Sequence, residues 1–235
     1  MIMVGDCREV LASCPDEYFD CIIADPPYVQ TSLEWDVTVA GWQQSVRRVL
    51  KKTGSMWVFG SLKMFMRDAE QYKGFKFAQD IVWEKHNGSG FAADRFRRVH
   101  EQAVQFYRDD AKWGDVYNVV PKTMDARPKV VRRKERPTHM GVIENSTYIS
   151  VDGGPRLMRS VIYQRSEHGR AAHPTQKPEG IVEPLLECSC PPGGRVLDPF
   201  SGSGTVEAVA LRLGRQPVSI EKDQQYADFG AWRTG

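Results

Sequence analysis

Short apolar runs alternate with longer amphipathic stretches along this chain. The runs at 20–24 and 55–60 are apolar almost throughout, which is typical of strands buried on both faces of a parallel sheet. Between them, residues 39–52 carry apolar side chains at a spacing of three and four, which predicts a helix that ends at Thr53 and Gly54. This alternation of strands with helices predicts an α/β fold with a parallel sheet.

The same pattern predicts further elements on both sides of a long irregular stretch. Strands are predicted at 75–84, 102–107, 195–198 and 216–220, and helices at 8–11, 62–72, 178–188 and 205–213. From 109 to 170 the periodicity fades, proline, glycine and charged residues dominate, and no helix is predicted. Because a stretch of that length without regular structure is usually functional, we treat it as a separate region.

The composition of the chain is that of an ordinary globular protein. Of its 235 residues, 41% are hydrophobic and 26% are charged, which fits a single domain or one domain with an insertion. Wholly disordered, collagen-like and coiled-coil proteins are excluded. No apolar run reaches the roughly 18 residues of a membrane span, so we expect no membrane partner.

The five cysteines do not form a zinc signature. Cys7, Cys14 and Cys21 lie in or beside apolar segments, and Cys188 and Cys190 form a single C-x-C pair. We interpret them as small buried thiols in a reducing cytosol, and we expect no metal site.

The net charge of +2 hides an uneven distribution. Residues 109–170 contain 12 Lys and Arg against 8 Asp and Glu, so this region carries +4 and the rest of the chain −2. A cluster of cations in a loop-rich region predicts a surface that binds the phosphates of nucleic acid, and a solvated charged loop is the alternative. The candidate contacts are Lys129, Arg132, Arg133, Lys134 and Arg136.

The motif DPFSGSGT runs from Asp198 to Thr205, between a predicted strand and a predicted helix. Glycines in such a turn let the backbone approach a ligand at the carboxyl end of a sheet. The next strand ends at Glu221, where an acid is suited to hydrogen-bond ribose hydroxyls. No Gly-Lys-Ser/Thr follows, which excludes a phosphate-binding loop, and the dinucleotide pattern G-x-G-x-x-G is absent. The motif alone predicts a nucleoside-containing cofactor, with a plain tight turn as the alternative.

A second motif, Asp25-Pro26-Pro27-Tyr28, follows the buried strand at 20–24. The two prolines are rigid and lack a backbone donor, so the turn offers a carboxylate, bare carbonyls and an aromatic ring. That set suits the exocyclic NH₂ group of a base, which needs hydrogen-bond acceptors for its protons and a ring to stack on. An ordinary Pro-Pro turn with a core tyrosine is the alternative for so short a match.

These two motifs, with His173-Pro-Thr-Gln-Lys-Pro178 between them, resemble those of the S-adenosylmethionine-dependent amino-methyltransferases of DNA. Their order, with the catalytic motif first and the Gly-rich motif last, is similar to the β class of that family. The resemblance implies a Rossmann-like α/β fold with a mixed seven-stranded sheet, helices on both faces and a circularly permuted motif order. It implies a catalytic domain at 1–108 and 171–235, interrupted by a target-recognition insertion at 109–170.

The resemblance also implies roles for individual residues. The residues around S-adenosylmethionine would be Asp6, Thr175, Lys177, Asp198, Phe200, Gly202, Gly204, Thr205 and Glu221. Asp6 would lie near the adenine amino group and Glu221 at the ribose, while Thr175 and Lys177 would hold the cofactor carboxylate. The methionine part would be lined by Asp198, Phe200, Gly202 and Gly204.

The implied activity is transfer of a methyl group to N6 of adenine in duplex DNA, at a specific site and after base flipping. The amine is a poor nucleophile because its lone pair conjugates with the ring. Asp25 and the Pro26 carbonyl would accept hydrogen bonds from its two protons, beside the rigid Pro27, and Tyr28 would stack on the flipped base. N4 of cytosine is the alternative target, and Asp rather than Ser at position 25 favours adenine.

Two further interpretations stay open, namely a catalytically silent DNA-binding protein of the same fold and an enzyme that acts on RNA. The intact Asp25 and the intact Gly-rich turn argue against the silent protein. The expected partner is double-stranded DNA, a homodimer is left open, and the sequence identifies no partner restriction enzyme. We expect a prokaryotic or phage-encoded protein of the cytoplasm, associated with the nucleoid.

Overall fold

A computed structural model describes residues 2–31, 36–89, 93–132, 147–167 and 176–234. The chain forms two compact units, one of Met1–Val119 with Ser160–Gly235 and one of Val120–Arg159. The smaller unit lies within the predicted insertion at 109–170, and the role of that insertion stays a prediction.

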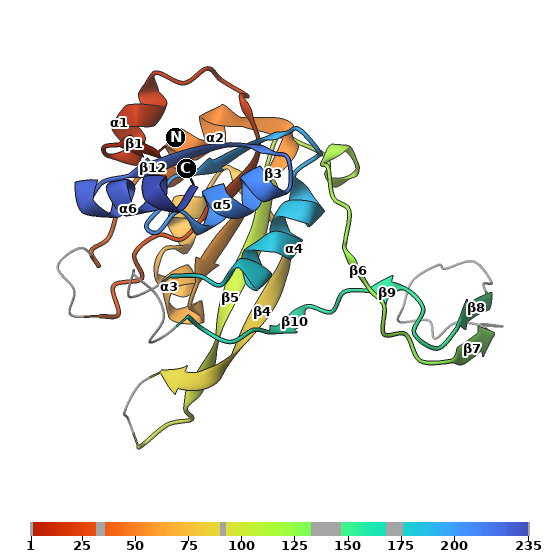
Figure 1. Ribbon diagram of the computed structural model, residues 1–235. Helices are drawn as coiled ribbons and strands as arrows, with labels where there is room; N and C mark the ends of the chain where they lie inside the picture. The colour runs from red at the N-terminus through yellow and green to blue at the C-terminus, as the bar shows by residue number, and fades with distance from the viewer. Residues whose placement is uncertain (1, 32–35, 90–92, 133–146, 168–175, 235) are drawn as a thin grey trace. The chain divides into compact units, whose positions relative to one another are not determined.

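A mixed sheet of eight strands in the described residues forms the centre of the larger unit (Figure 1). In spatial order the strands are β1 (Ile2–Val4), β12 (Gln216–Glu221), β11 (Arg195–Asp198), β2 (Phe19–Ala24), β3 (Leu50–Gly60), β5 (Arg98–Arg108), β4 (Phe75–Ser89) and β10 (Val161–Tyr163). The resemblance implied seven strands, which is one short, because β10 pairs with β4 and adds an eighth strand to the sheet.

The first five strands of this order are all parallel, while β5 runs antiparallel to both of its neighbours. Parallel strands that follow one another in space end at the same edge of the sheet. The segments that leave β1, β2, β3, β11 and β12 therefore meet at one edge, although they lie far apart in the sequence.

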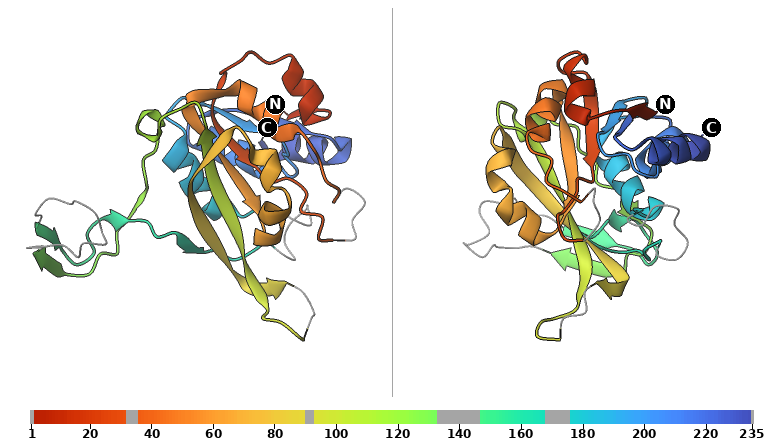
Figure 2. Two further views of the ribbon diagram at one scale, coloured as in Figure 1. Left: turned by 180° about the vertical axis from the view of Figure 1, so that it is seen from behind. Right: turned by 90° about the vertical axis from the view of Figure 1, so that its left-hand side faces the viewer.

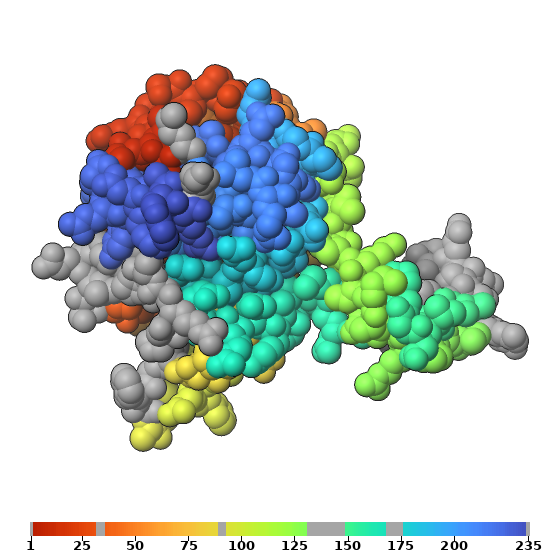
Figure 3. All heavy atoms as spheres, in the orientation of Figure 1, coloured from red at the N-terminus to blue at the C-terminus, as the bar shows by residue number. Residues whose placement is uncertain are grey.

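Helices cover both faces of the sheet, as the right-hand view of Figure 2 shows. One face carries α1 (Cys7–Ala12), α2 (Trp42–Val49) and α3 (Leu62–Arg67), and the other carries α4 (Glu179–Ser189), α5 (Thr205–Arg212) and α6 (Gln224–Thr234). The N-terminal and C-terminal segments lie against each other on the face drawn in Figure 3, in keeping with the pairing of β1 with β12.

Alternate side chains of the central strands enter two separate apolar cores. In β2, Cys21 and Ile23 belong to the core under α4 and α5, while Ile22 and Ala24 belong to the core under α1 and α2. This period-two alternation buries every position from Cys21 to Ala24, while Asp20 is half-buried, which explains the apolar run in the sequence.

Most predicted elements are confirmed, with differences at their ends. The helix predicted at 39–52 ends at Val49, because Leu50 already begins β3 and its side chain is fully buried in the core. The helix predicted at 62–72 is divided into α3 and a 3₁₀ turn at Ala69–Tyr72. Strands β4 and β5 extend past their predicted ends as a long hairpin (Figure 1).

The smaller unit contains two short antiparallel ribbons. One pairs β6 (Lys122–Thr123) with β9 (Arg156–Leu157), and the other pairs β7 (Lys129–Arg132) with β8 (Thr147–Ser150). Regular pairing thus exists where no periodicity predicted it, because two- to four-residue strands are too short to show a pattern.

The cysteines are free thiols, and Cys7, Cys21, Cys188 and Cys190 are buried while Cys14 is half-buried. The interpretation of buried thiols is confirmed for those four. Within the described residues, no helix is long and apolar enough to cross a bilayer.

The close approach of β3 to β2 at Gly54 provides a test of the fold. A Cβ at Gly54 would lie 2.5 Å from the backbone oxygen of Asp20, so Gly54→Ala has to push the two strands apart. We expect a loss of about 1–3 kcal/mol in the free energy of unfolding, measured with urea. Gly114 has no atom within 4 Å of its own Cβ position, so Gly114→Ala is the matched control. Equal unfolding midpoints for the two variants would contradict this packing.

Candidate active site

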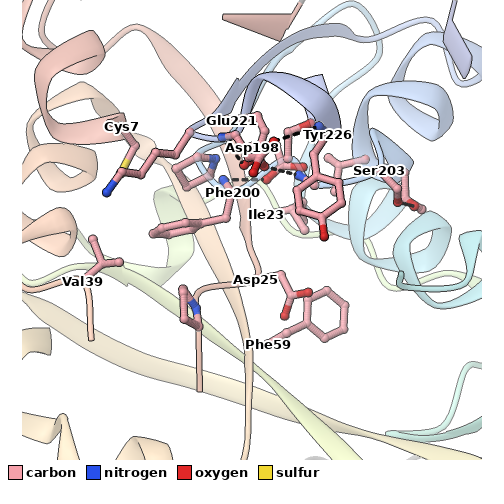
Figure 4. A pocket seen from close by; sticks show the side chains of 18 of the residues that line it. Cys7, Ile23, Asp25, Val39, Phe59, Asp198, Phe200, Ser203, Glu221 and Tyr226 are labelled. Atoms are coloured by element: carbon pink, nitrogen blue, oxygen red, sulfur yellow. Dashed lines mark hydrogen bonds between the residues drawn. The ribbon is translucent and has the colours of Figure 1, made fainter. Parts of the chain in front are cut away.

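A cavity of about 580 Å³ lies at the edge where the five parallel strands end. Its walls come from the segments after β1, β2, β11 and β12, from the end of β3 and from the segment before α4. Figure 4 shows Asp25 and Phe59 together at one end of the cavity and Asp198 and Glu221 together at another. The predicted residues that line it are Asp6, Asp25, Pro27, Lys177, Asp198, Phe200, Gly202, Thr205 and Glu221.

The Gly-rich turn between β11 and α5 forms one wall of this cavity. Gly202 and Gly204 have φ angles of 49° and 71°, in the left-handed region that glycine adopts without strain. Gly204 does not line the cavity. A Cβ there would lie 3.1 Å from the Cα of Gly230 in α6, so this glycine lets α6 pack closely against the turn.

Glu221 holds the Gly-rich turn in place, a role that sequence reasoning missed. Its Oε2 accepts a 2.6 Å hydrogen bond from the amide of Gly202, and its Oε1 accepts one of 2.9 Å from the amide of Asp223. Because a carboxylate offers about four acceptor positions, Glu221 can hold both amides and still accept from a ligand. Its predicted contact with ribose hydroxyls stays a prediction.

Asp198 is a buried carboxyl at the end of β11, only 3% exposed. Burial raises its pKa well above the usual value, and nearby Asp25, Glu221 and Glu207 add to that shift. The amide of Phe200 opposes the shift with a 3.1 Å hydrogen bond to Asp198 Oδ1. A buried carboxyl without a positively charged partner either keeps its proton or ionises beside a bound cationic group.

Asp6 caps α1 at another part of the cavity wall. Its carboxylate accepts from the backbone and side chain of Arg8, and the ion pair measures 2.6 Å. This hydrogen bonding lowers the pKa of Asp6 to about 2. Arg8 also donates to the backbone oxygen of Ala40, so it ties α1 to the segment before α2.

The Asp25–Tyr28 turn leaves β2 and presents its carboxylate to the cavity. The Tyr28 hydroxyl donates to Asp25 Oδ1 at 2.8 Å, and the Lys177 ammonium donates to Asp25 Oδ2 at 2.6 Å. Burial raises the pKa of Tyr28 well above its usual value, with Asp25 and Glu101 contributing. Pro26, within this turn, is buried. The structure therefore brings Lys177 to the predicted catalytic acid, whereas its predicted contact with the cofactor carboxylate stays a prediction.

Asp36, which sequence reasoning also missed, organises the chain after this turn. Its buried carboxylate accepts hydrogen bonds of 2.6–2.8 Å from the backbone amides of Val29, Gln30 and Thr31. Val29 has a φ of 57°, a left-handed conformation that is strained for a β-branched residue. The three bonds to Asp36 offset that strain and fix how the chain leaves the Asp25–Tyr28 turn.

Several predicted residues lie where the structure gives little or no description. Thr175, Arg133, Lys134 and Arg136 lie outside the described residues. Arg132 is described as part of β7, and Lys129 is an exposed residue of the same strand. The predicted contacts of these cations with DNA stay predictions.

Comparison with known proteins connects this geometry to an activity. Residues 19–231 match the family described as DNA methylase. Type II methyltransferase M.HinfI of Haemophilus influenzae is 32% identical over 260 residues, which cover 99% of this chain and 67% of that protein. DNA adenine methyltransferase YhdJ of Escherichia coli strain K12 is 31% identical over 248 residues, which cover 99% of this chain and 81% of that protein.

Solved structures show the same fold. M1.HpyAVI, crystallised as its SAM complex, superposes with a TM-score of 0.64 at 23% identity over 99% of this chain and 100% of that one. The cytosine-N4-specific PvuII DNA methyltransferase superposes with a TM-score of 0.66 at 17% identity over 98% of this chain and 84% of that one. The expected α/β methyltransferase fold is confirmed.

The buried Asp198 gives the unfolding free energy a distinctive pH dependence. The folded protein binds the Asp198 proton more tightly than the unfolded chain, so this stabilisation is present at low pH and is lost as the pH rises through the raised pKa. Asp198→Asn keeps the acceptor for Phe200 but cannot ionise. Between the ordinary pKa of an aspartate and the raised pKa of Asp198, we expect the free energy of unfolding of the wild type to fall relative to that of this variant. The expected slope is about 1.4 kcal/mol per pH unit.

Urea denaturation at a series of pH values measures this difference. Asp228→Asn, an exposed carboxylate on α6, is the matched control and should follow the wild type at every pH. Parallel pH curves for the wild type and Asp198→Asn would contradict the raised pKa.

Proposed function

Since the chain belongs to the DNA methylase family, we propose that it transfers a methyl group from S-adenosylmethionine to N6 of adenine in duplex DNA. The observation that carries this proposal is the position of Asp25 in the same cavity as the Gly-rich turn and Glu221. One end of the cavity offers acceptors for an amine, and the other offers acceptors for a nucleoside. A methyl donor and a base amine could therefore meet inside it.

The residues present fit S-adenosylmethionine, which supplies the electrophilic methyl group when it is bound. The cofactor carries an ammonium, a sulfonium and ribose hydroxyls, and the wall contains the carboxyl groups of Asp198 and Glu221. A cationic group that binds Asp198 gives that buried carboxyl the opposite charge it lacks. Phe200 closes the wall beside these acids, where its ring meets Trp42 edge-on at 5.3 Å between centroids.

Asp25 and the turn that holds it would do the chemical work on the base. The carboxylate accepts a hydrogen bond from the amine and favours a pyramidal nitrogen, whose lone pair then points into the cavity. Two acceptor positions of Asp25 are engaged by Tyr28 and Lys177, so about two of its four remain for the amine. This contribution is positioning and electrostatic stabilisation, without a covalent intermediate on the protein.

Adenine is the base that we propose, with N4 of cytosine as the second candidate. Support for adenine comes from Asp at position 25 and from the name of the Escherichia coli relative, a DNA adenine methyltransferase. Support for cytosine is a likeness of fold alone, to the cytosine-N4-specific enzyme. The base has to leave the duplex stack to reach a cavity of this kind, so base flipping is part of the proposal.

Replacing Asp25 tests the role of the carboxylate. Asp25→Ala removes an acceptor from the amine and leaves the Gly-rich turn intact, so we expect kcat to fall by about 10²–10³ while cofactor affinity changes little. The measurement is label transfer to unmethylated DNA, followed by nucleoside analysis of the product. Asp80→Ala, at an exposed carboxylate on β4, is the control. Near-normal transfer by Asp25→Ala would refute the role, and N4-methylcytosine as the wild-type product would refute the choice of base.

The cations of the predicted insertion provide a separate test of DNA binding. Replacing Arg132, Arg133 and Lys134 together by Ala removes three charges that could neutralise phosphates. We expect weaker DNA binding and a shallower dependence of affinity on salt, by about 0.9 in the log–log slope for each phosphate that is no longer neutralised. Cofactor affinity should not change.

The control for that variant replaces Lys52, Lys73 and Lys76, which are exposed, lie outside the predicted insertion and are near the start of β3 or the start of β4. Those positions are at the opposite edge of the sheet from the cavity. If the two triple variants had equal salt slopes, the cluster would be a solvated charged loop and not a DNA-binding surface.

A further inference from the structure

Four charged groups and one hydroxyl meet behind the catalytic turn. The carboxylates are Asp25 and Glu101, the ammonium groups are Lys177 and Lys85, and the hydroxyl is that of Tyr28. The side chains of the four charged residues are only 9–25% exposed. Two positive and two negative charges make the cluster electrically balanced, which is the condition under which charges are tolerated away from water.

Glu101 lies at the centre of this cluster. Its Oε1 accepts an ion-paired hydrogen bond from Lys85, and its Oε2 lies 3.5 Å from the Lys177 ammonium and 3.3 Å from the Tyr28 hydroxyl. Lys177 and Tyr28 are also the two groups that donate to Asp25. Glu101 therefore contacts both donors that hold the catalytic carboxylate.

The alternation of the β4–β5 hairpin explains how a charge comes to this buried place. Trp83 and Glu101 are directly opposite each other in the ladder, and Lys85 and Ala103 lie two residues away on the same face. Trp83, Ala103 and Phe59 belong to one apolar core, and this face continues beyond them as Lys85 and Glu101. The Lys85 ammonium lies 4.5 Å above the Trp83 ring, which places its charge toward Glu101.

Electrostatics agree with this geometry. Burial would raise the pKa of Glu101, but Lys177 and Lys85 outweigh burial and hold that pKa below its usual value. Burial would lower the pKa of Lys177, but Asp25 and Glu101 outweigh it and raise that pKa. Both groups therefore stay charged at neutral pH. The Lys177 ammonium also lies 5.4 Å from the Tyr28 ring and 5.3 Å from the Phe59 ring, so rings and carboxylates surround it.

We propose that Glu101 is a positioning residue for methyl transfer, one that orients Asp25 through Lys177 and Tyr28. This inference rests on the proposed function. Without Glu101, Asp25 is the one carboxylate that remains beside Lys177 among the described contacts. The Tyr28 hydroxyl also loses one of its two nearby acceptors. The two donors are then drawn toward Asp25, and the carboxylate turns away from the direction in which it receives the amine.

The variant Glu101→Gln tests this directly, because it keeps the shape of the side chain and removes its charge. We expect kcat for DNA methylation to fall roughly 10- to 100-fold, the effect of losing one charge-assisted hydrogen bond. Affinity for S-adenosylmethionine, measured by calorimetry, should stay within about twofold, since Glu101 does not line the cavity. Glu84→Gln is the matched control, because Glu84 is an exposed carboxylate on β4 opposite His100. Equal kcat values for the two variants would overturn the proposal.

A double variant separates positioning from simple charge balance. Glu101→Gln combined with Lys85→Met restores an equal number of positive and negative charges without restoring the contacts to Lys177 and Tyr28. We expect it to recover the thermal stability that Glu101→Gln loses but not kcat. Full recovery of kcat would show that Glu101 only neutralises Lys85, and would overturn the proposal.

A measurement without cofactor or DNA distinguishes failure of this inference from failure of the proposed function. The titration of the Lys177 ammonium can be followed by NMR in the ligand-free protein. The groups that face it are Asp25 and Glu101, and removing one negative charge should lower its pKa in Glu101→Gln. An equal Lys177 pKa in the wild type and in Glu101→Gln would contradict the contact between Lys177 and Glu101. A wild-type protein that transfers no methyl group would instead overturn the proposed function, whatever the titration shows.

Discussion

The convergence of five parallel strand ends at one edge of the sheet brings together the acidic groups Asp25, Asp198 and Glu221 of the cavity. Asp25 follows β2, and Asp198 and Glu221 are the last residues of β11 and β12. These three strands are neighbours in space although their sequence positions span most of the chain. The strands themselves are apolar on both faces, so the edge is where polar side chains can gather without breaking the core. The Asp25–Tyr28 turn and the Gly-rich turn thus line one cavity because their strands end at the same edge of the sheet.

Asp25 and Asp198 differ in how the surrounding protein compensates their negative charge. Asp25 has an ammonium and a hydroxyl within hydrogen-bond distance, so its charge is compensated before any ligand arrives. Asp198 is buried beside other acids, with one backbone amide bound to its Oδ1. The first arrangement keeps a hydrogen-bond acceptor ready and fixed in direction. The second leaves a deficit of positive charge, which a cationic ligand is able to fill.

The sequence predicted the strands and helices that surround the two motifs well, because each has a clear period and a Gly or Pro stop. It missed β10 and the ribbons of the smaller unit, where two to four residues are too few to show a period. It also missed Glu101 and Lys85, which lie just beyond the predicted ends of their strands. Glu101 contacts Tyr28 and Lys177, which are 73 and 76 residues away along the chain, and Lys85 contacts Glu101. No local sequence pattern carries that information. Asp36 was missed for a similar reason. Its partners are backbone amides, which every residue except proline has, so no sequence motif marks the interaction.

The pairing of β1 with β12 has a consequence for how the molecule is made. Ile2 is the register partner of Ser219, and the glycine-rich turn between β11 and α5 packs against α6 through Gly204 and Gly230. During synthesis, β1 leaves the ribosome long before its neighbour exists, and the strand must wait unpaired. Closing a loop of this length costs conformational entropy, so we expect this contact to form late in folding. We therefore expect the half of the cavity around Glu221 to assemble after the core around β2 and β3.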